Sequence, residues 1–152
     1  MSSKPSESAR EAIGHAIMRW QDATALFDEE VGKRLNLSLS ERQCLSCLAQ
    51  GPRPARDIAE ATRLTRGAVT TLLDRLEARD LVRRTPDTHD RRQILVAMTE
   101  SAQQATMHYY APIAMEGMRF LAGFSDEQLT TILAFIEGAT DLQLAQVDRL
   151  RA

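Results

Sequence analysis

The amino-acid sequence predicts a mainly α-helical fold with a small β-hairpin wing, arranged as a winged helix-turn-helix flanked by long N- and C-terminal helices. Three observations support this fold class. Apolar residues recur at helical spacing before residue 35 and after residue 100, two short helices and a tight turn follow Pro54, and a β-branched hairpin ends near Thr99. We divide the chain into a disordered tail (1–7), an N-terminal helix (8–36), a winged module (37–99) and C-terminal helices (100–152).

From residue 8 to residue 35 the apolar residues alternate in steps of four and three, which predicts one long amphipathic helix. The stripe consists of Ile13, Ile17, Trp20, Phe27 and Val31, with the semi-polar Thr24 between them. A helix this long cannot bury a single apolar stripe by itself. We therefore expect partner helices from the same chain or from a second copy, and we interpret 8–36 and 100–152 as dimerisation helices.

A short helix is predicted over residues 41–50. Ser40 and Gln43 have the spacing of a capping box, in which each side chain bonds the backbone N–H of the other residue. Leu39 precedes this box and is placed to pack against Cys44. Gly51 tolerates positive φ and is expected to end the helix.

Two further helices complete the predicted helix-turn-helix. The first spans residues 55–62, and Pro54 is acceptable at its start because the missing N–H is not needed there. Thr65 is expected to cap the second helix, which runs to Arg79. On a helical wheel its outer face opposes an apolar stripe and carries mostly small or polar residues, namely Arg66, Gly67, Thr70, Thr71, Asp74 and Arg75.

The wing is predicted as two strands, 82–85 and 93–98, that flank a turn-rich segment. Four arginines surround this turn and give it a basic tip: Arg83, Arg84, Arg91 and Arg92. After the wing a helix is expected to run to Leu121, and Pro112 should end it or bend it. Ser125 and Gln128 form a second capping box, which starts the final helix.

The formal net charge of −2 conceals an uneven distribution. Residues 52–99 contain ten Arg and seven acidic residues, whereas the rest of the chain has an acidic excess of five. The guanidinium group suits phosphate oxygens and guanine edges. A helix with a small polar face and a free N-terminus also suits the major groove and its phosphates. These features favour nucleic-acid binding, although so modest a basic excess alone is also typical of a solvated charged face.

Several motifs are specific to one protein family. They are D-R-L-E at 74–77, L-V-x-R at 81–84, D-x-x-D-R-R at 87–92, T-E at 99–100, L-S-x-x-Q at 39–43 and F-S-D-E-Q-L at 124–129. With these motifs, nearly the whole chain resembles the MarR (multiple antibiotic resistance regulator) family. The resemblance implies a homodimer whose first and last helices intertwine and whose two winged modules bind a pseudo-palindromic duplex. It also implies a transcriptional regulator, most often a repressor, that responds to a small ligand.

The resemblance assigns roles to single residues. It places Arg92 in the minor groove with Asp90 orienting it, and Arg91 against phosphate. The full set of expected DNA contacts is Thr65, Arg66, Gly67, Thr70, Thr71, Arg75, Arg84, Asp90, Arg91 and Arg92. The sequence departs from the family pattern at Gly67, Ala68, Thr71 and His89, so base preference does not transfer. The family's small aromatic or phenolic effectors imply a pocket, for which the candidate residues are His15, Trp20, Phe27, Met107 and His108.

Two alternatives remain open from the sequence. Cys44 and Cys47 form a C-x-x-C pair that suggests either buried core thiols or an oxidation switch. A winged module could also serve protein contact without specific DNA binding, because fold alone does not fix function. We find no nucleophile–base pair, phosphate-binding loop or complete metal ligand set, so we expect no enzyme activity, metal or cofactor. Without an apolar run of membrane-spanning length, we expect a cytoplasmic protein.

Overall fold

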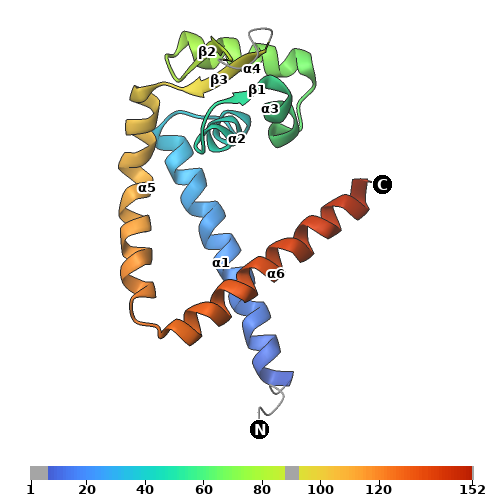
Figure 1. The fold of residues 1–152 in the computed structure, drawn as a ribbon, viewed down its shortest axis with the longest axis vertical. Helices are drawn as coiled ribbons and strands as arrows, with labels where there is room; N and C mark the ends of the chain where they lie inside the picture. The colour runs from blue at the N-terminus through green and yellow to red at the C-terminus, as the bar shows by residue number, and fades with distance from the viewer. Residues whose placement is uncertain (1–6, 88–92, 152) are drawn as a thin grey trace. The chain divides into compact units, whose positions relative to one another are not determined.

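The structure is a computed structural model that describes residues 7–87 and 93–151. It is mainly helical with a small antiparallel sheet, which confirms the predicted fold class (Figure 1). The elements are, in order, α1 (Glu7–Arg34), α2 (Leu39–Leu48), β1 (Arg53–Pro54), α3 (Ala55–Thr62), α4 (Arg66–Ala78), β2 (Val82–Pro86), β3 (Ile94–Met98), α5 (Glu100–Leu121) and α6 (Asp126–Arg151).

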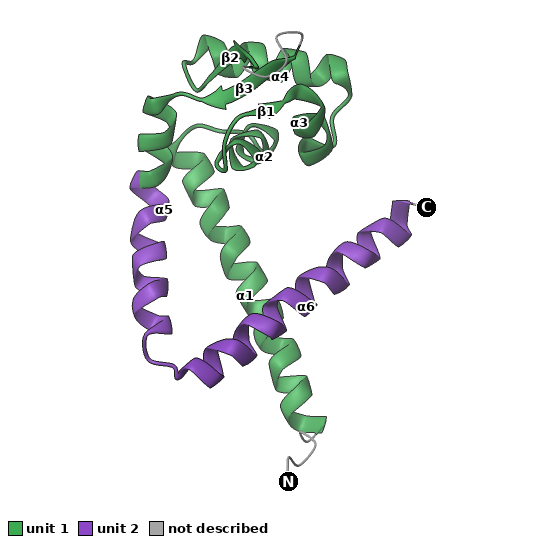
Figure 2. Cartoon of the chain, in the orientation of Figure 1, with its two compact units in different colours: residues 1–107 green, residues 108–152 purple. Residues whose placement is uncertain are grey.

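The chain forms two compact units, residues 1–107 and residues 108–152 (Figure 2). The first contains α1 to α4, the sheet and the start of α5, and the second contains the rest of α5 and α6. The boundary falls inside α5, which continues through Pro112. The helix therefore does not end at this proline. Ser125 starts α6 as predicted, since its hydroxyl accepts the Gln128 N–H at 3.3 Å while its own N–H donates to Gln128 Oε1 at 2.8 Å.

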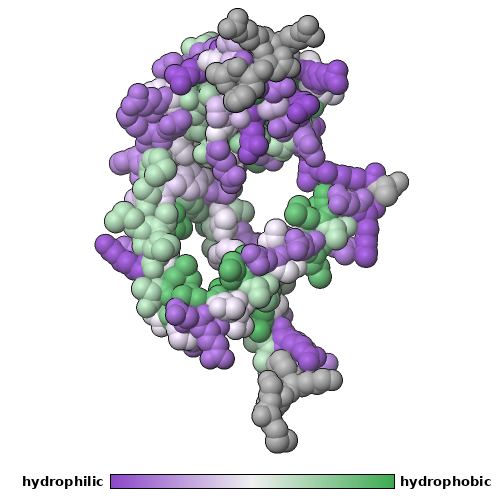
Figure 3. Space-filling model, viewed as in Figure 1, coloured by the Kyte–Doolittle hydropathy of each residue, from purple (hydrophilic) through white to green (hydrophobic). Residues whose placement is uncertain are grey.

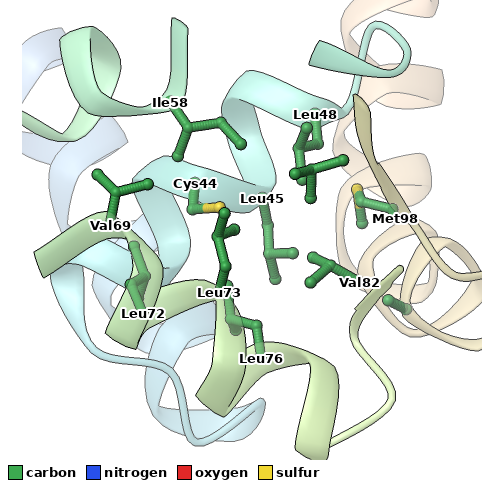
Figure 4. Packing of buried hydrophobic residues seen from close by; sticks show 12 residues of the cluster. Cys44, Leu45, Leu48, Ile58, Val69, Leu72, Leu73, Leu76, Val82 and Met98 are labelled. Carbon is green, nitrogen blue, oxygen red and sulfur yellow. The ribbon is translucent and has the colours of Figure 1, made fainter. Parts of the chain in front are cut away.

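The core of the winged module is formed by α2, α3, α4, β2, β3 and the start of α5 (Figure 4). Burying each large aliphatic side chain contributes about 1.5–3 kcal/mol. The apolar stripe of α4 supplies four of the buried residues, so the opposite face of this helix is turned away from the core. The buried cluster comprises Cys44, Leu45, Leu48, Ile58, Val69, Leu72, Leu73, Leu76, Val82, Val96, Met98 and Ala102.

The start of α2 differs from the prediction. Ser38, not Ser40, is the N-cap: its hydroxyl accepts the Glu41 N–H at 3.4 Å, and its N–H donates to Glu41 Oε2 at 2.7 Å. The helix is Leu39–Leu48, and Leu39 is 60% exposed, so the expected packing of Leu39 on Cys44 was wrong. Two overlapping boxes competed, and the one with a carboxylate acceptor forms the stronger bonds.

Three helices of the first unit end in the same way, with a left-handed residue followed by a leucine. Asn36, Arg63 and Asp80 have φ of 51°, 56° and 54°. The N–H of the next residue then bonds back into the helix: Leu37 to the Gly32 carbonyl at 2.8 Å, Leu64 to the Ala59 carbonyl at 3.2 Å and Leu81 to the Leu76 carbonyl at 2.9 Å. Each leucine packs against the core. These are Schellman caps without glycine.

The sheet has the strand order β1-β3-β2, and both pairings are antiparallel. The hairpin of β2 and β3 confirms the predicted wing, with Arg84 opposite Val96. Strand β1 was not predicted, because it has two residues and one of them is Pro54. It pairs Arg53 with Val96 and leads directly into α3.

The long helices expose much of their apolar surface (Figure 3). Only Val31 and Gly32 are buried among the described residues of α1, and no described residue of α6 is buried. Among the described residues, no helix is long and apolar enough to cross a membrane. The exposed apolar residues of the three long helices include Ile13, Met18, Trp20, Leu26, Ile113, Met115, Met118, Phe120, Leu133, Phe135, Ile136, Leu142, Leu144 and Leu150.

Candidate nucleic-acid interface

Helix α4 begins where the sequence predicted. Thr65 is the N-cap, and its hydroxyl accepts the Ala68 N–H at 3.3 Å. This cap satisfies one of the free backbone donors of the first turn and leaves others, together with the positive end of the helix dipole, directed outward. A short connection after α3 therefore presents an exposed helix start.

The outer face of α4 is exposed along the first three turns. Arg66, Gly67, Thr70, Thr71 and Arg75 all lie on it, opposite the buried stripe. The Thr70 and Thr71 hydroxyls donate to the Arg66 and Gly67 carbonyls at 3.1 and 3.3 Å. Their oxygens remain able to accept from donors outside the helix. The face thus combines two cations with acceptors on short side chains.

Gly67 lies on this face beside open space. A Cβ added there would meet nothing within 4 Å, so packing within the chain does not require glycine. Glycine inside a helix costs about 1 kcal/mol relative to alanine. A close approach by another molecule's backbone is the usual physical use for such a glycine.

Arg84 is held within the module. Its guanidinium donates to Asp74 Oδ1 at 2.7 Å and to Glu77 Oε2, while its backbone N–H donates to Glu77 Oε1 at 3.2 Å. Partial burial acts to lower the pKa of Arg84, but the bonds to Asp74 and Glu77 outweigh it and raise that pKa. Sequence reasoning named Arg84 as a DNA contact and missed this role for the D-R-L-E motif, which joins β2 to α4.

Three predicted contacts, Asp90, Arg91 and Arg92, lie outside the described residues, as does most of the turn between β2 and β3. Of the predicted DNA contacts, the structure therefore describes Thr65, the residues on α4, and Arg84. Arg83 is exposed on β2.

The two cysteines lie on α2. Cys44 is fully buried and burial raises its pKa to about 12, with smaller contributions from Cys47 and Glu41. Burial also raises the pKa of Cys47, against the opposing effect of Arg53. Both shifts disfavour the thiolate that oxidation requires. Within the described ranges, no three His, Cys, Asp or Glu side chains are grouped to hold a metal ion.

The predicted effector residues are spread over two helices and both units. His15 and Trp20 are exposed on α1, and Phe27 is partly buried there. Met107 is at the end of the first unit, and His108 begins the second, where its ring packs edge-on against Tyr109 at 5.0 Å.

A surface hollow of about 480 Å³ lies within the first unit. It is bordered by the end of α2, by β2 and β3, and by the start of α5, and Met107 is the one predicted effector residue that lines it. The hollow brings together segments that are distant in the sequence, so no local pattern indicated it.

Comparison with known proteins identifies the module. Residues 35–93 match the model of the MarR family. The chain is 27% identical over 153 residues to the uncharacterised HTH-type transcriptional regulator YcgE of Bacillus subtilis, covering 99% of both chains. It is 29% identical over 92 residues to the HTH-type transcriptional repressor NicR of Pseudomonas putida, covering 60% of this chain and 58% of NicR.

Solved structures share the fold. A mutant of S. aureus MepR bound to an oligodeoxyribonucleotide superposes with a TM-score of 0.55 at 18% identity, covering 86% of this chain and 97% of MepR. NadR in complex with 4-hydroxyphenylacetate gives a TM-score of 0.59 at 16% identity, covering 91% and 96%. Fold, motifs and family match therefore agree that the winged module, residues 35–93, is similar to the winged helix-turn-helix of the MarR family.

Proposed function

We propose that the protein is a homodimeric transcriptional repressor that binds a pseudo-palindromic DNA site and is released by a small aromatic or phenolic effector. The observation that carries the DNA-binding part is the exposed outer face of α4, with Arg66 and Arg75, two hydroxyls and the open Gly67. Such a face fits a major groove about 12 Å wide, where guanidinium groups reach bases and phosphates. Contacts by Asp90, Arg91 and Arg92 are part of the same proposal.

Dimerisation is supported by the apolar surface of the long helices. Ile13 and Trp20, which share the apolar stripe of α1, are 50% and 62% exposed, and large apolar side chains exposed in a contiguous stripe mark protein interfaces. Replacing Trp20 by Glu is expected to shift the protein from dimer to monomer in sedimentation, whereas Arg34→Glu, on the same helix, leaves the dimer intact. A monomeric wild-type protein at micromolar concentration would contradict this part.

Repression and release are supported by relatives. NicR is a repressor, and NadR binds 4-hydroxyphenylacetate. An effector acts by binding the DNA-free arrangement of the two recognition helices more tightly than the DNA-bound one.

The DNA-binding proposal is tested by selecting duplexes from a random library with purified protein and measuring their affinity by fluorescence anisotropy. Arg75→Ala and Arg66→Ala should each weaken binding on the order of tenfold or more. Arg34→Ala is the matched control, because this arginine is exposed on α1 and its side chain forms no hydrogen bond or ion pair within the described residues.

Salt dependence provides the second readout. Binding through several phosphates makes the logarithm of affinity fall steeply with the logarithm of salt concentration. If no duplex is enriched, or if Arg66→Ala and Arg75→Ala bind like wild type, the α4 face is not the interface, and a winged module for protein contact becomes the better interpretation.

A further inference from the structure

The C-terminal end of α4 is bonded to both helices that flank the winged module. Two consecutive residues make these bonds, Arg79 at the C-cap of α4 and Asp80 immediately after it. All the groups involved lie in the first compact unit. Neither residue belongs to the exposed face of α4 that carries the proposed DNA contacts.

Arg79 connects α4 to the junction of α1 and α2. Its Nη2 donates to the Leu35 carbonyl at 3.2 Å and to the Asn36 carbonyl at 2.9 Å, and its Nη1 donates to Glu41 Oε1 at 3.3 Å. The carbonyls belong to the Schellman cap that ends α1, where no further helical turn can use them. One planar guanidinium thus satisfies three acceptors that come from two segments.

Glu41 connects Arg79 to the N-terminal cap of α2, because its two carboxylate oxygens have different partners. Oε2 accepts the Ser38 N–H at 2.7 Å in the capping box, and Oε1 accepts from Arg79. The Glu41 side chain is 9% exposed, so its charge is shielded from water. A displacement of the α1 end therefore strains the bonds that hold the end of α4.

Asp80 connects the same point to the start of α5. Its carbonyl accepts the Thr99 hydroxyl at 2.6 Å and the Ser101 hydroxyl at 3.3 Å, and its Oδ2 accepts from Ser101 at 3.2 Å. The Thr99 N–H donates to the Leu81 carbonyl at 3.1 Å. Thr99 also caps α5 by accepting the Ala102 N–H.

We propose that Arg79 is a positioning residue for DNA binding, which fixes the angle of α4 by bonding its C-terminal end to the end of α1. The inference rests on the proposed function in that α4 is taken as the recognition helix. Asp80 bonds the same end of α4 to the start of α5. A movement of α1 or of α5 would therefore displace α4 at Arg79 and Asp80, the pair that we call the joint. In a dimer this joint sets the spacing of the two recognition helices.

The test compares Arg79→Met and the milder Arg79→Lys with wild type on a selected duplex, at a temperature where circular dichroism shows all three fully folded. Arg79→Met should weaken binding about tenfold. Arg79→Lys should restore little of this loss, because the three donors of an ammonium lie on one nitrogen, which cannot reach the acceptors that Nη1 and Nη2 of the guanidinium reach separately. Arg34→Met is the matched control that removes a nearby arginine without removing these bonds.

The salt slope separates positioning from contact. Loss of a phosphate contact lowers the slope by about one, whereas loss of positioning leaves it unchanged. A lowered slope, an unchanged affinity, or full rescue by lysine would each overturn the inference. If wild type enriches no duplex, the proposed function itself fails.

Hydrogen exchange tests the joint without DNA. In Arg79→Lys the amides of Leu37 and Ser38 should exchange faster, while those of the core residues Leu72 and Leu73 keep their protection. Equal acceleration at all four amides would show general destabilisation and would count against a local joint.

Discussion

The guanidinium of Arg84 lies 2.7 Å from Asp74 Oδ1 and also bonds Glu77, so that strand β2 and helix α4 are joined by charge-assisted bonds. The Arg84 side chain is 29% exposed, less than the cation of any other ion pair among the described residues. The basic strand is thereby held against the helix that is proposed to enter the groove, and this arginine has part of its charge neutralised before any DNA arrives.

The first prediction concerns this link. In a double-mutant cycle, Arg84→Ala and Asp74→Ala should show a coupling near 1 kcal/mol in urea unfolding, at the upper end for surface pairs. The matched pair is Arg119 and Glu116, which lie 2.6 Å apart with both side chains 68% exposed and should couple by about 0.3 kcal/mol. Equal couplings would mean that the Arg84 pairing adds nothing beyond an ordinary surface ion pair.

Replacing Gly67 by Ala separates folding from DNA binding. The added Cβ meets open space, so the unfolding free energy should rise by about 1 kcal/mol. The same methyl group should weaken binding to a selected duplex, because it stands where the proposed DNA backbone approaches. A variant that is stabilised and binds with wild-type affinity would exclude close approach at this position.

Arg63 is exposed and has φ of 56°. A left-handed conformation costs an L-residue about 1–2 kcal/mol, and glycine avoids this cost at a smaller loss of chain entropy. Arg63→Gly should therefore raise the unfolding free energy by about 0.5–1 kcal/mol. Glu60→Gly, in the helical part of α3, should lower it by about the same amount. Calorimetric melting of both variants checks the opposite signs.

Glu41 should make stability depend on pH. Burial acts to raise the pKa of Glu41, but the bonds from Ser38 and the charges of Arg79 and Arg75 bring that pKa below its ordinary value. Its contribution is therefore present above the unfolded pKa of about 4.3 and is lost as pH falls through the folded value. The stability gap between wild type and Glu41→Gln should narrow from pH 6 to pH 3.

The control for Glu41 is Glu60→Gln, which changes an exposed carboxylate of α3. The difference in unfolding free energy between Glu60→Gln and wild type, measured in urea, should stay nearly constant from pH 6 to pH 3. If the difference in unfolding free energy between wild type and Glu41→Gln grew on acidification, the pKa of Glu41 would not be lowered in the folded protein.

Thiol reactivity should follow burial. Because burial raises the pKa of Cys44 to about 12, the folded protein should show almost no reaction of Cys44 with a disulfide reagent at pH 8, and Cys47 should react first. Mass spectrometry of the labelled protein distinguishes the two. Rapid labelling of Cys44 in the native state would instead support the hypothesis of an oxidation switch.

Local sequence patterns predicted a helix correctly where its capping residue and its apolar stripe indicated the same bounds. Thr65 and the apolar steps from Val69 to Leu76 fixed α4, and Ala55–Thr62 was predicted residue for residue. At α2 two capping boxes overlapped, and only the carboxylate of Glu41, bonded to both Ser38 and Arg79, decides between them. That second bond spans 38 residues, so no local rule includes it.

The helix ends and the links between segments were not predictable in the same way. Asn36, Arg63 and Asp80 take left-handed conformations without glycine, and the leucine that follows each one is the signal that was overlooked. The arginines looked alike in the sequence. The fold gives Arg84 and Arg79 internal acceptors and leaves Arg75 exposed on α4, which local composition cannot distinguish.

The strand order β1-β3-β2 places a proline in each edge strand, Pro54 in β1 and Pro86 in β2. Proline has no N–H to donate, so neither border of the sheet offers an unbroken row of donors to a strand from another molecule. The wing is in this way protected against edge-to-edge aggregation. If copies of the protein associate, as the proposed dimer requires, the exposed apolar side chains of the long helices offer the surface for it.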